Sequence, residues 1–303
     1  MTHPATRCIL LVVMKRRPPI LLVFVDGLGI GSRDAVVNPL YSGSCPNLAD
    51  LLDYHAKPVD ACLGVVGLPQ SATGQTALLT GVNAPQIVGR HVEGFPGLAL
   101  RKIINEHNIF LSLRERGKAS TFANGYFVED IDEVRRSRLQ SATTVATLGA
   151  FNTVRNAEDV RNNRAVYQDL TRQSLQARGY GGPLVTPEQA AAHLIDLTLT
   201  HDLTLFEYFQ TDRAGHRCDK DRTLVVLSLL DAFLNVLSTE AERQDFLFVL
   251  TSDHGNVEDC NTRLHTLNAV PFVAVGNGAE ELQREVESLT DVTPALIDRV
   301  TTA

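Results

Sequence analysis

Short apolar runs along the chain alternate with glycine-rich and polar stretches. Each run is rich in β-branched and aromatic residues and stops at a glycine or a polar residue, as buried strands do. The run 245–250 is apolar almost throughout, which is typical of a parallel strand. The pattern predicts an α/β protein, with strands expected at 20–25, 203–209, 245–250 and 270–276.

Helical patterns lie between and after these runs. The stretch 71–80 has a helical pattern until Gly81 stops it, and 221–237 is amphipathic. Further helices are expected at 46–52 with Asn47 as its cap, at 160–178, and at 290–297 as a capped terminal helix.

The middle of the chain differs from both ends. From about residue 85 to about residue 201 it holds most of the arginines that can meet an anion, and it lacks long apolar runs. We interpret this stretch as a smaller inserted cap over the carboxyl edge of the sheet. The expected divisions are an N-terminal extension at 1–13, a core formed by 14–88 and 201–303, and a substrate-facing cap at 89–200.

Composition narrows the class of protein. The 303 residues are 44% hydrophobic and 21% charged, enough for a full core, and a net charge of −7 argues against nucleic acid or an anionic membrane as a partner. Five cysteines without CxxC spacing suit a reducing cytoplasm.

The apolar run 8–14 is too short to span a bilayer, and no other segment approaches that length. We treat 1–13 as dispensable, with Met14 as a candidate start.

Polar residues that can bind a metal follow the expected strands. In open α/β sheets ligands bind at the carboxyl ends of the strands. The alternative is a set of polar strand ends without chemistry, which is the better interpretation of any one of them alone. Together they offer only oxygen and nitrogen donors, which suit two divalent ions such as Mn²⁺ or Zn²⁺. The set is Asp26, Ser71, Asp212, His216, Asp253, His254 and His265.

Ser71 stands at or near the start of the helix 71–80. It is either a simple helix cap or a nucleophile, because free amide groups and the positive end of the helix dipole favour a bound phosphate there. Thr73 and Thr76 are fallback nucleophiles. The glycines after Asp26 permit a tight turn, but they do not form the GxGxxG motif of dinucleotide-binding proteins.

These motifs resemble the alkaline phosphatase superfamily, within it the branch of cofactor-independent phosphoglycerate mutase and phosphopentomutase. The resemblance covers about 180 residues on both sides of the cap. It lies in Asp26-Gly27, in Ser71 three residues before Gly74, in Asp212-x-x-Gly-His216, in Asp253-His254-Gly-Asn, in His265 ahead of Asn268 to Phe272, and in the helix start at 291–294.

The resemblance implies a mainly parallel sheet flanked by helices and two metal ions. It implies that Asp212, His216 and His265 hold one ion. The other ion would be held by Asp26, Ser71, Asp253 and His254.

The chain also departs from the mutases of that branch. They have Gly-His where this chain has Gly74-Gln75, and their cap is much longer. Phosphopentomutases have threonine at the position of Ser71. The segment Arg161 to Arg164 resembles the arginine-bearing helix of the mutase only faintly. Candidate substrate-binding residues in the cap are Arg90, His91, Arg161 and Arg164.

Two cations would clamp an in-line displacement at phosphorus, and a phosphoserine should form. Attack by water then gives a phosphomonoester hydrolase, and attack by a second hydroxyl gives a phosphotransferase or mutase. Our first interpretation is a metal-dependent phosphatase or phosphotransferase acting on a small phosphorylated metabolite. A phosphoglycerate mutase or phosphopentomutase-like enzyme is the alternative, and an inactive metal-binding protein is a third. The sequence predicts no oligomeric state.

Overall fold

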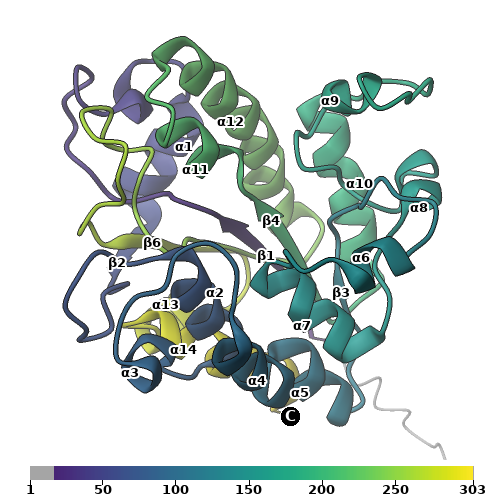
Figure 1. Cartoon of the computed structure of the whole chain (residues 1–303). Coiled ribbons are helices and arrows are strands. Elements are labelled where there is room, and N and C mark those ends of the chain that lie inside the picture. Colours follow the sequence, from purple (N-terminus) through teal and green to yellow (C-terminus); the bar gives the residue numbers. More distant parts are fainter. Residues whose placement is uncertain (1–16, 303) are drawn as a thin grey trace, which may run out of the picture.

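A computed structural model describes residues 17–302, so the expected extension at 1–13 lies outside the described residues. One six-stranded sheet runs through the molecule, in the order β2-β6-β5-β1-β4-β3 (Figure 1). The strands are β1 Ile20–Val25, β2 Ala56–Val59, β3 Ser120–Phe122, β4 Leu203–Tyr208, β5 Leu247–Thr251 and β6 Val270–Val275.

The centre of the sheet is parallel. β1 pairs in parallel with β4 on one side and with β5 on the other, and β3 pairs in parallel with β4. β6 is antiparallel to β5, so the residues that precede β6 lie at the edge where β5 ends. β2 is antiparallel to β6. The predicted α/β class and the four predicted strands are therefore confirmed, with boundaries within two residues.

Helices cover both faces of the sheet, because alternate side chains of each strand point to opposite faces. In β1, Leu22 and Phe24 pack on one helical layer, whereas Leu21 and Val23 pack on the other. The first layer contains α2 Ser71–Thr80, α4 Leu98–His107, α5 Ile109–Glu115, α7 Ala142–Phe151, α13 Ala279–Glu285 and α14 Leu289–Thr301. The second contains α1 Pro46–Asp50, α10 Pro187–Leu199, α11 Gln210–Gly215 and α12 Lys220–Arg243, with the short turns η1 Pro39–Tyr41 and η2 Leu51–His55.

The stretch 89–200 differs from the separate cap that we expected. It supplies the edge strand β3, and its helices α4, α5, α7 and α10 pack on the sheet itself. Apart from α7, residues 124–183 form a small lobe beside β3, held by bridges from Asn124 to Val166 and from Gly125 to Arg155. The lobe contains α6 Asp132–Arg136, α8 Ala157–Arg161 and α9 Gln173–Gln176, and α3 Ala84–Val88 lies before α4 (Figure 1). Short apolar segments in this stretch hid its contribution to the core.

Two helix predictions were wrong in detail. The expected helix 160–178 ends at Arg161, because Asn163, Leu170 and Arg172 adopt the left-handed conformation that ends a helix. Asn47 does not cap α1, since its side-chain amide donates to Asp231 of α12 at 2.8 Å. The predicted helices after Ser71 and at the C-terminus are present, the latter with a capping box between Ser288 and Asp291.

The helix α12 is longer than the predicted helix 221–237. Its 24 residues have a length and composition that would suffice to cross a membrane. In the structure it packs against α1 and α10. Val226, Leu230 and Phe233 are buried in the core of the second layer. Its apolar character is therefore explained by packing inside the protein.

Candidate metal centre and substrate cavity

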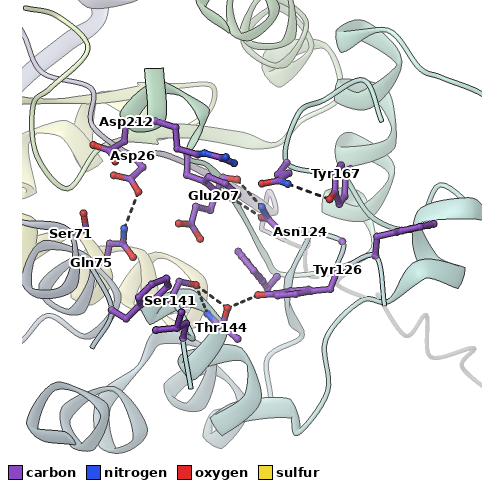
Figure 2. A pocket seen from close by; sticks show the side chains of 18 of the residues that line it. Asp26, Ser71, Gln75, Asn124, Tyr126, Ser141, Thr144, Tyr167, Glu207 and Asp212 are labelled. Carbon is purple, nitrogen blue, oxygen red and sulfur yellow. Dashed lines mark hydrogen bonds between the residues drawn. The ribbon is translucent and has the colours of Figure 1, made fainter. Parts of the chain in front are cut away.

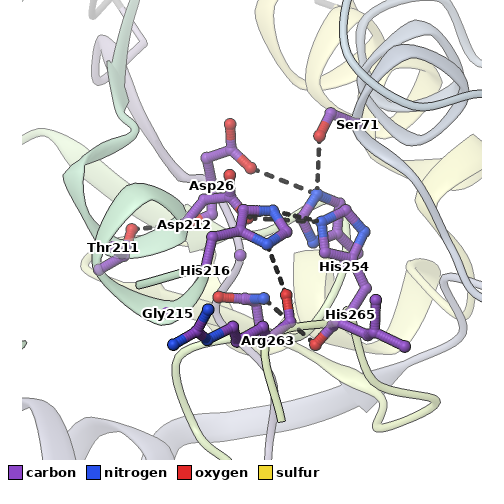
Figure 3. Close-up of polar contacts among 12 residues, drawn as sticks. Asp26, Ser71, Thr211, Asp212, Gly215, His216, His254, Arg263 and His265 are labelled. Atoms are coloured by element: carbon purple, nitrogen blue, oxygen red, sulfur yellow. Dashed lines mark hydrogen bonds and ion pairs between the residues drawn. The ribbon is translucent and has the colours of Figure 1, made fainter. Parts of the chain in front are cut away.

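The seven residues predicted at strand ends meet at the carboxyl edge of the sheet (Figure 3). Asp26 follows β1 directly, and Asp253 and His254 follow β5 after one serine. His265 arrives from the loop before β6, which the antiparallel direction of β6 brings to the same edge. We call this set of seven residues the donor edge.

One group of donors forms around Asp212. The segment between Asp212 and His216 is helical, since α11 begins two residues before Asp212 and His216 follows its last residue. The Asp212 Oδ1 atom lies 3.3 Å from His216 Nε2 and 3.5 Å from His265 Nε2. The two Nε2 atoms are 3.1 Å apart. These three side chains can hold one metal ion.

A second group forms around His254. Its Nε2 atom lies 3.0 Å from Ser71 Oγ, 3.3 Å from Asp26 Oδ1 and 3.4 Å from Asp253 Oδ2. Asp26, Asp212 and His254 also offer atoms within 4.8 Å of one another. Asp212 therefore belongs to both groups, whereas the resemblance assigned it to one ion only.

Hydrogen bonds fix the direction of the imidazoles. The Nδ1 atoms of His216 and His265 lie 2.6 Å and 2.8 Å from the carbonyl oxygens of Arg263 and Pro69. Nδ1 of His254 faces the Gly255 carbonyl at 3.4 Å. A carbonyl oxygen only accepts, so each Nδ1 carries a proton and each ring turns its Nε2 atom toward the centre, where a neutral ring would offer a lone pair to a cation. Metal-binding histidines are oriented in this way.

Unpaired oxygens show that the donors fit a cation. Asp26 Oδ1 and Asp212 Oδ1 are buried and accept no hydrogen bond from any described residue. These are the same atoms that face His254 and the two outer histidines. Buried carboxylate oxygens without partners are costly, and a divalent ion would satisfy them. The donor set therefore fits hard or borderline divalent metals.

Burial and neighbouring charges shift the pKa values of several donors. Burial, together with the carboxylates of Asp253 and Asp212, raises the pKa of Asp26 well above its ordinary range. Burial also raises the pKa of Asp253 to about 7 and lowers that of His254 to about 3. The neighbouring Asp212 side chain raises the pKa of His216 to about 9. Positive charge at the donor edge would favour the ionised carboxylates.

Ser71 is the first residue of α2, one position after the N-cap residue Gln70. Gly74 lets this helix approach the end of β5, since a Cβ there would lie 2.8 Å from the carbonyl oxygen of Asp253. Gln75, where the mutases have histidine, points at the same site. Its amide nitrogen donates to Asp26 at 3.2 Å and to Asp253 at 3.1 Å. Thr73 turns away, with its hydroxyl bonded to the Gln70 carbonyl.

Glu258 is a functional residue whose role the sequence did not reveal. This buried carboxylate accepts from the amides of Gly29 at 2.9 Å and Asn256 at 2.8 Å, and from the side chains of Thr266 and Asn268. It therefore ties together the three loops that carry Asp26, His254 and His265. Its position two residues after the Asp-His-Gly-Asn motif was visible, but its partners lie far away in sequence.

A cavity of about 530 Å³ opens beside the donor edge (Figure 2). Ser71, Gln75, Asp26 and Asp212 line one end of it. Glu207, the only charged residue of the buried strand β4, lines it as well and accepts a hydrogen bond from Thr143. Burial raises the pKa of Glu207 to about 7. A charge inside an apolar strand was the signal that could have identified it.

The four substrate-binding residues predicted in the cap do not line this cavity. Arg161 pairs with Glu129, and Arg164 pairs with Asp159 at 3.0 Å, on the surface of the lobe. Arg90 is exposed, and His91 lies 3.2 Å from the Val65 carbonyl. The cations that do line the cavity are Arg178 and Arg213. Charge alone did not tell a surface arginine from one in the cavity.

Comparison with known proteins agrees with this geometry. A family model described as Metalloenzyme superfamily matches residues 18–303. Among curated proteins, the chain is similar to two enzymes named 2,3-bisphosphoglycerate-independent phosphoglycerate mutase. That of Ehrlichia canis (strain Jake) is 28% identical over 38% of this chain and 25% of the relative. That of Clostridium novyi (strain NT) is 31% identical over 37% of this chain and 24% of the relative. The chain thus spans about a quarter of the length of these relatives.

Solved structures support the expected fold. The alkaline phosphatase from the Antarctic bacterium TAB5 superimposes with a TM-score of 0.56 at 13% identity, covering 94% of this chain and 98% of that one. The phosphoglycerate mutase of Leishmania mexicana gives a TM-score of 0.50 at 12% identity, covering 94% and 95%. The predicted alkaline-phosphatase-like architecture is therefore confirmed, and the family and the donor groups support the use of divalent metal.

Proposed function

The chain belongs to the Metalloenzyme superfamily, and from that premise we propose that it is a metal-dependent phosphomonoester hydrolase or phosphotransferase. Its substrate is a small phosphorylated metabolite, and the reaction proceeds through a phosphoserine at Ser71. Two divalent ions, Mn²⁺ or Zn²⁺, are held by the donor edge. Asp212, His216 and His265 hold one ion, and Asp26, Asp253, His254 and Ser71 hold the other, with Asp212 close enough to contact both.

The position of Ser71 carries this proposal. Its hydroxyl lies 3.0 Å from His254 Nε2, at the junction of the donor edge and the cavity. Ser71 is half-buried, whereas the fallback residues Thr73 and Thr76 are fully buried. The Thr73 hydroxyl donates to the Gln70 carbonyl, and the Thr76 hydroxyl donates to the Ala72 carbonyl. Ser71 is thus the hydroxyl of this helix that can reach a phosphate in the cavity.

Bound divalent ions would lower the pKa of the Ser71 hydroxyl and neutralise charge on the phosphate oxygens. The chain itself supplies the remaining functions. The first amides of α2 point toward an anion held at Ser71, and the helix dipole has the matching sign. Gln75 keeps Asp26 and Asp253 in place through its two hydrogen bonds.

In the first step a bond forms between Ser71 Oγ and phosphorus, and the bond from phosphorus to the ester oxygen breaks. The Ser71 hydroxyl loses its proton, and the departing alcohol gains one. In the second step water attacks phosphorus and restores the hydroxyl, which releases inorganic phosphate. If a substrate hydroxyl attacks in place of water, the outcome is phosphotransfer.

A second candidate function is a mutase in which the same alcohol takes the phosphoryl group back at another hydroxyl. The names of the curated relatives favour it. Such a reaction requires a closed site that retains the intermediate and excludes water. The small lobe at 124–183 is the only part of the described residues 89–200 that stands away from the sheet, which makes retention more demanding.

A phosphoenzyme trap tests the proposal. Protein loaded with Mn²⁺ or Zn²⁺ turns over a phosphate monoester that carries a labelled phosphate, and the reaction is quenched in acid. The peptide that carries the label is then mapped. We expect the label on Ser71, and Ser71→Ala should lose it together with nearly all turnover. The matched variant Thr73→Ala should keep both. A label on Thr73 or Thr76 with Ser71 unmodified would refute the assignment. Scoring free phosphate and isomerised product in the same reactions separates hydrolase from mutase.

A further inference from the structure

The cavity continues from Ser71 to a wall that is chemically unlike the donor edge. In Figure 2, Ser71 and Asp26 lie at one end and Tyr126 and Tyr167 at the other. A phosphate held at Ser71 therefore has its organic group in the space between them. The cavity is also lined by four phenylalanines, and we call the six aromatic residues together the aromatic wall: Phe95, Phe122, Tyr126, Phe127, Tyr167 and Phe209.

Hydrogen bonds hold the tyrosines of this wall in place. The Tyr126 hydroxyl lies 2.6 Å from Thr144 Oγ1, and the Tyr167 hydroxyl accepts from Gln168 at 3.2 Å. Burial raises the pKa of the Tyr126 hydroxyl well above its ordinary value, so this hydroxyl stays protonated. Rings fixed before binding lose little conformational entropy when a ligand arrives, which favours stacking over adaptable polar contacts.

The cavity offers little to a second negative charge on the substrate. Arg178 is engaged, since it donates to the Phe127 carbonyl at 2.9 Å and its guanidinium carbon lies 5.7 Å from the centre of that ring. Arg213 is exposed and adjoins Asp212. Glu207 adds a carboxyl group to the lining. A substrate carboxylate deep in the cavity would meet the carboxyl group of Glu207, and Arg178, the cation beside the aromatic wall, already donates to the protein backbone.

We infer that the substrate is a phosphate monoester whose organic group carries an uncharged planar ring, which stacks against the aromatic wall while the phosphate lies at Ser71. This substrate class rests on the proposed function, because it takes the reacting phosphate to be at the donor edge. The ring is either a nucleobase or a simple aryl group. Both share the flat π-face that aromatic side chains bind.

Matched pairs of esters separate the ring from the rest of the substrate. Adenosine 5′-monophosphate and ribose 5-phosphate differ by the base, and benzyl phosphate and ethyl phosphate differ by the phenyl ring. In both pairs the leaving group is a primary alkoxide, so kcat/KM reports recognition more than leaving-group chemistry. 3-Phosphoglycerate and glycerol 3-phosphate differ by the charge of a carboxylate. Binding of each ester to metal-loaded Ser71→Ala protein is measured in parallel.

We expect the ring-bearing member of at least one ring pair to be preferred about tenfold in kcat/KM and in binding, the size of one stacked ring. A preference in the adenosine pair alone identifies a nucleobase, and one in the benzyl pair alone identifies an aryl group. We expect 3-phosphoglycerate to be poorer than glycerol 3-phosphate. Equal kcat/KM and binding within both ring pairs, or 3-phosphoglycerate as the best substrate, would overturn the inference.

Variants of the wall locate the effect. Phe95→Ala, at an exposed loop position, and Tyr126→Leu should each reduce the ring preference severalfold, judged against the ring-free esters on the same variant. Tyr126→Phe keeps the ring and should keep the preference. Tyr54→Leu removes an exposed tyrosine that does not line the cavity and serves as the control. An unchanged ring preference in Phe95→Ala and Tyr126→Leu contradicts stacking on this wall. If Tyr126→Leu fails to fold, the ring preference of Phe95→Ala alone decides whether the wall binds the ring.

Failure of the proposed function has a different signature. In that case no ester is turned over and no phosphoserine forms with either metal. Binding to the Ser71→Ala protein still compares the two members of each pair. Tighter binding of the ring-bearing esters would then support the ring-binding cavity without the chemistry, and equal binding would overturn both.

Discussion

The donor edge and the aromatic wall face each other across one cavity, yet they are built in different ways. The donor edge consists of side chains gathered at the carboxyl edge of the sheet, and several of its atoms are tied to backbone groups, such as His265 Nδ1 to the Pro69 carbonyl. The wall is drawn from loops, from the edge strand β3 and from the lobe at 124–183. The comparison suggests that the chemistry is fixed by the sheet, whereas substrate choice is set by the more variable segments around it.

The largest effect is expected at the donor shared by both groups. Asp212→Asn keeps the shape of the side chain but removes the negative charge that faces His216, His265 and the second group. Loss of a supporting residue costs about 10- to 100-fold in metal affinity or activity, and loss of this donor should cost more. Metal titration measures the loss of affinity, and turnover measures the loss of activity. His216→Ala, which removes a half-exposed member of one group, should be milder; the reverse order would argue against a shared carboxylate.

A smaller effect is expected where the donor edge is supported from behind. Glu258→Gln replaces one acceptor oxygen with a donor, although Gly29, Asn256, Thr266 and Asn268 all donate to this side chain. We expect about 10- to 100-fold weaker metal binding and a loss of about 1–3 kcal/mol in the free energy of unfolding.

The matched control for Glu258→Gln is Asp259→Asn, the next residue, which retains an acceptor for the Asn261 amide. Thermal unfolding with chelator gives the stability term, and metal titration gives the affinity. Wild-type metal affinity in Glu258→Gln would show that the loops hold the donors without it.

Glu207 lies between the two regions, and its effect should depend on pH. The pKa is raised to about 7 by burial from an ordinary value of 4.5, so the folded protein binds the proton more tightly than the unfolded chain. Its contribution to stability is therefore fully present below about pH 4.5 and is lost as pH rises through about 7. Between pH 5 and pH 7 the wild type should lose about 1–2 kcal/mol relative to Glu207→Gln, with chelator present.

Denaturant unfolding across this pH range measures the difference between wild type and Glu207→Gln. The exposed substitution Glu115→Gln is the control and should run parallel to the wild type. A constant difference between wild type and Glu207→Gln would mean that Glu207 is not held protonated by the fold.

The smallest effect is expected in the lobe surface. Arg164→Ala removes exposed ion pairs with Asp159 and Glu158, which are worth about 0–1 kcal/mol, and it should leave kcat/KM within about twofold of the wild type. A rise in KM for Arg164→Ala would place this arginine at the substrate site after all.

Arg213→Gln alters a cation that lines the cavity, and it should raise KM for phosphate esters.

The sequence alone determined four of the six strands and several of the polar residues near their ends. A buried parallel strand needs a continuous apolar run, and its carboxyl end needs a turn, so Asp26 and the pair Asp253-His254 stood out by local pattern. Ser71 stood out because Gly81 and the helical pattern define α2. Each of these signals lies within about ten neighbouring residues.

The tertiary structure alone decided which side chains meet across long separations. Asp212 serves both donor groups because β1 lies between β4 and β5, and Glu258 joins three loops because β6 reverses direction beside β5. The same holds for the stretch 89–200, whose short apolar segments join the sheet only once β4 is there to pair with β3. Burial and hydrogen-bond partners are properties of the packed molecule, so the cavity and its aromatic wall have no local pattern in the chain.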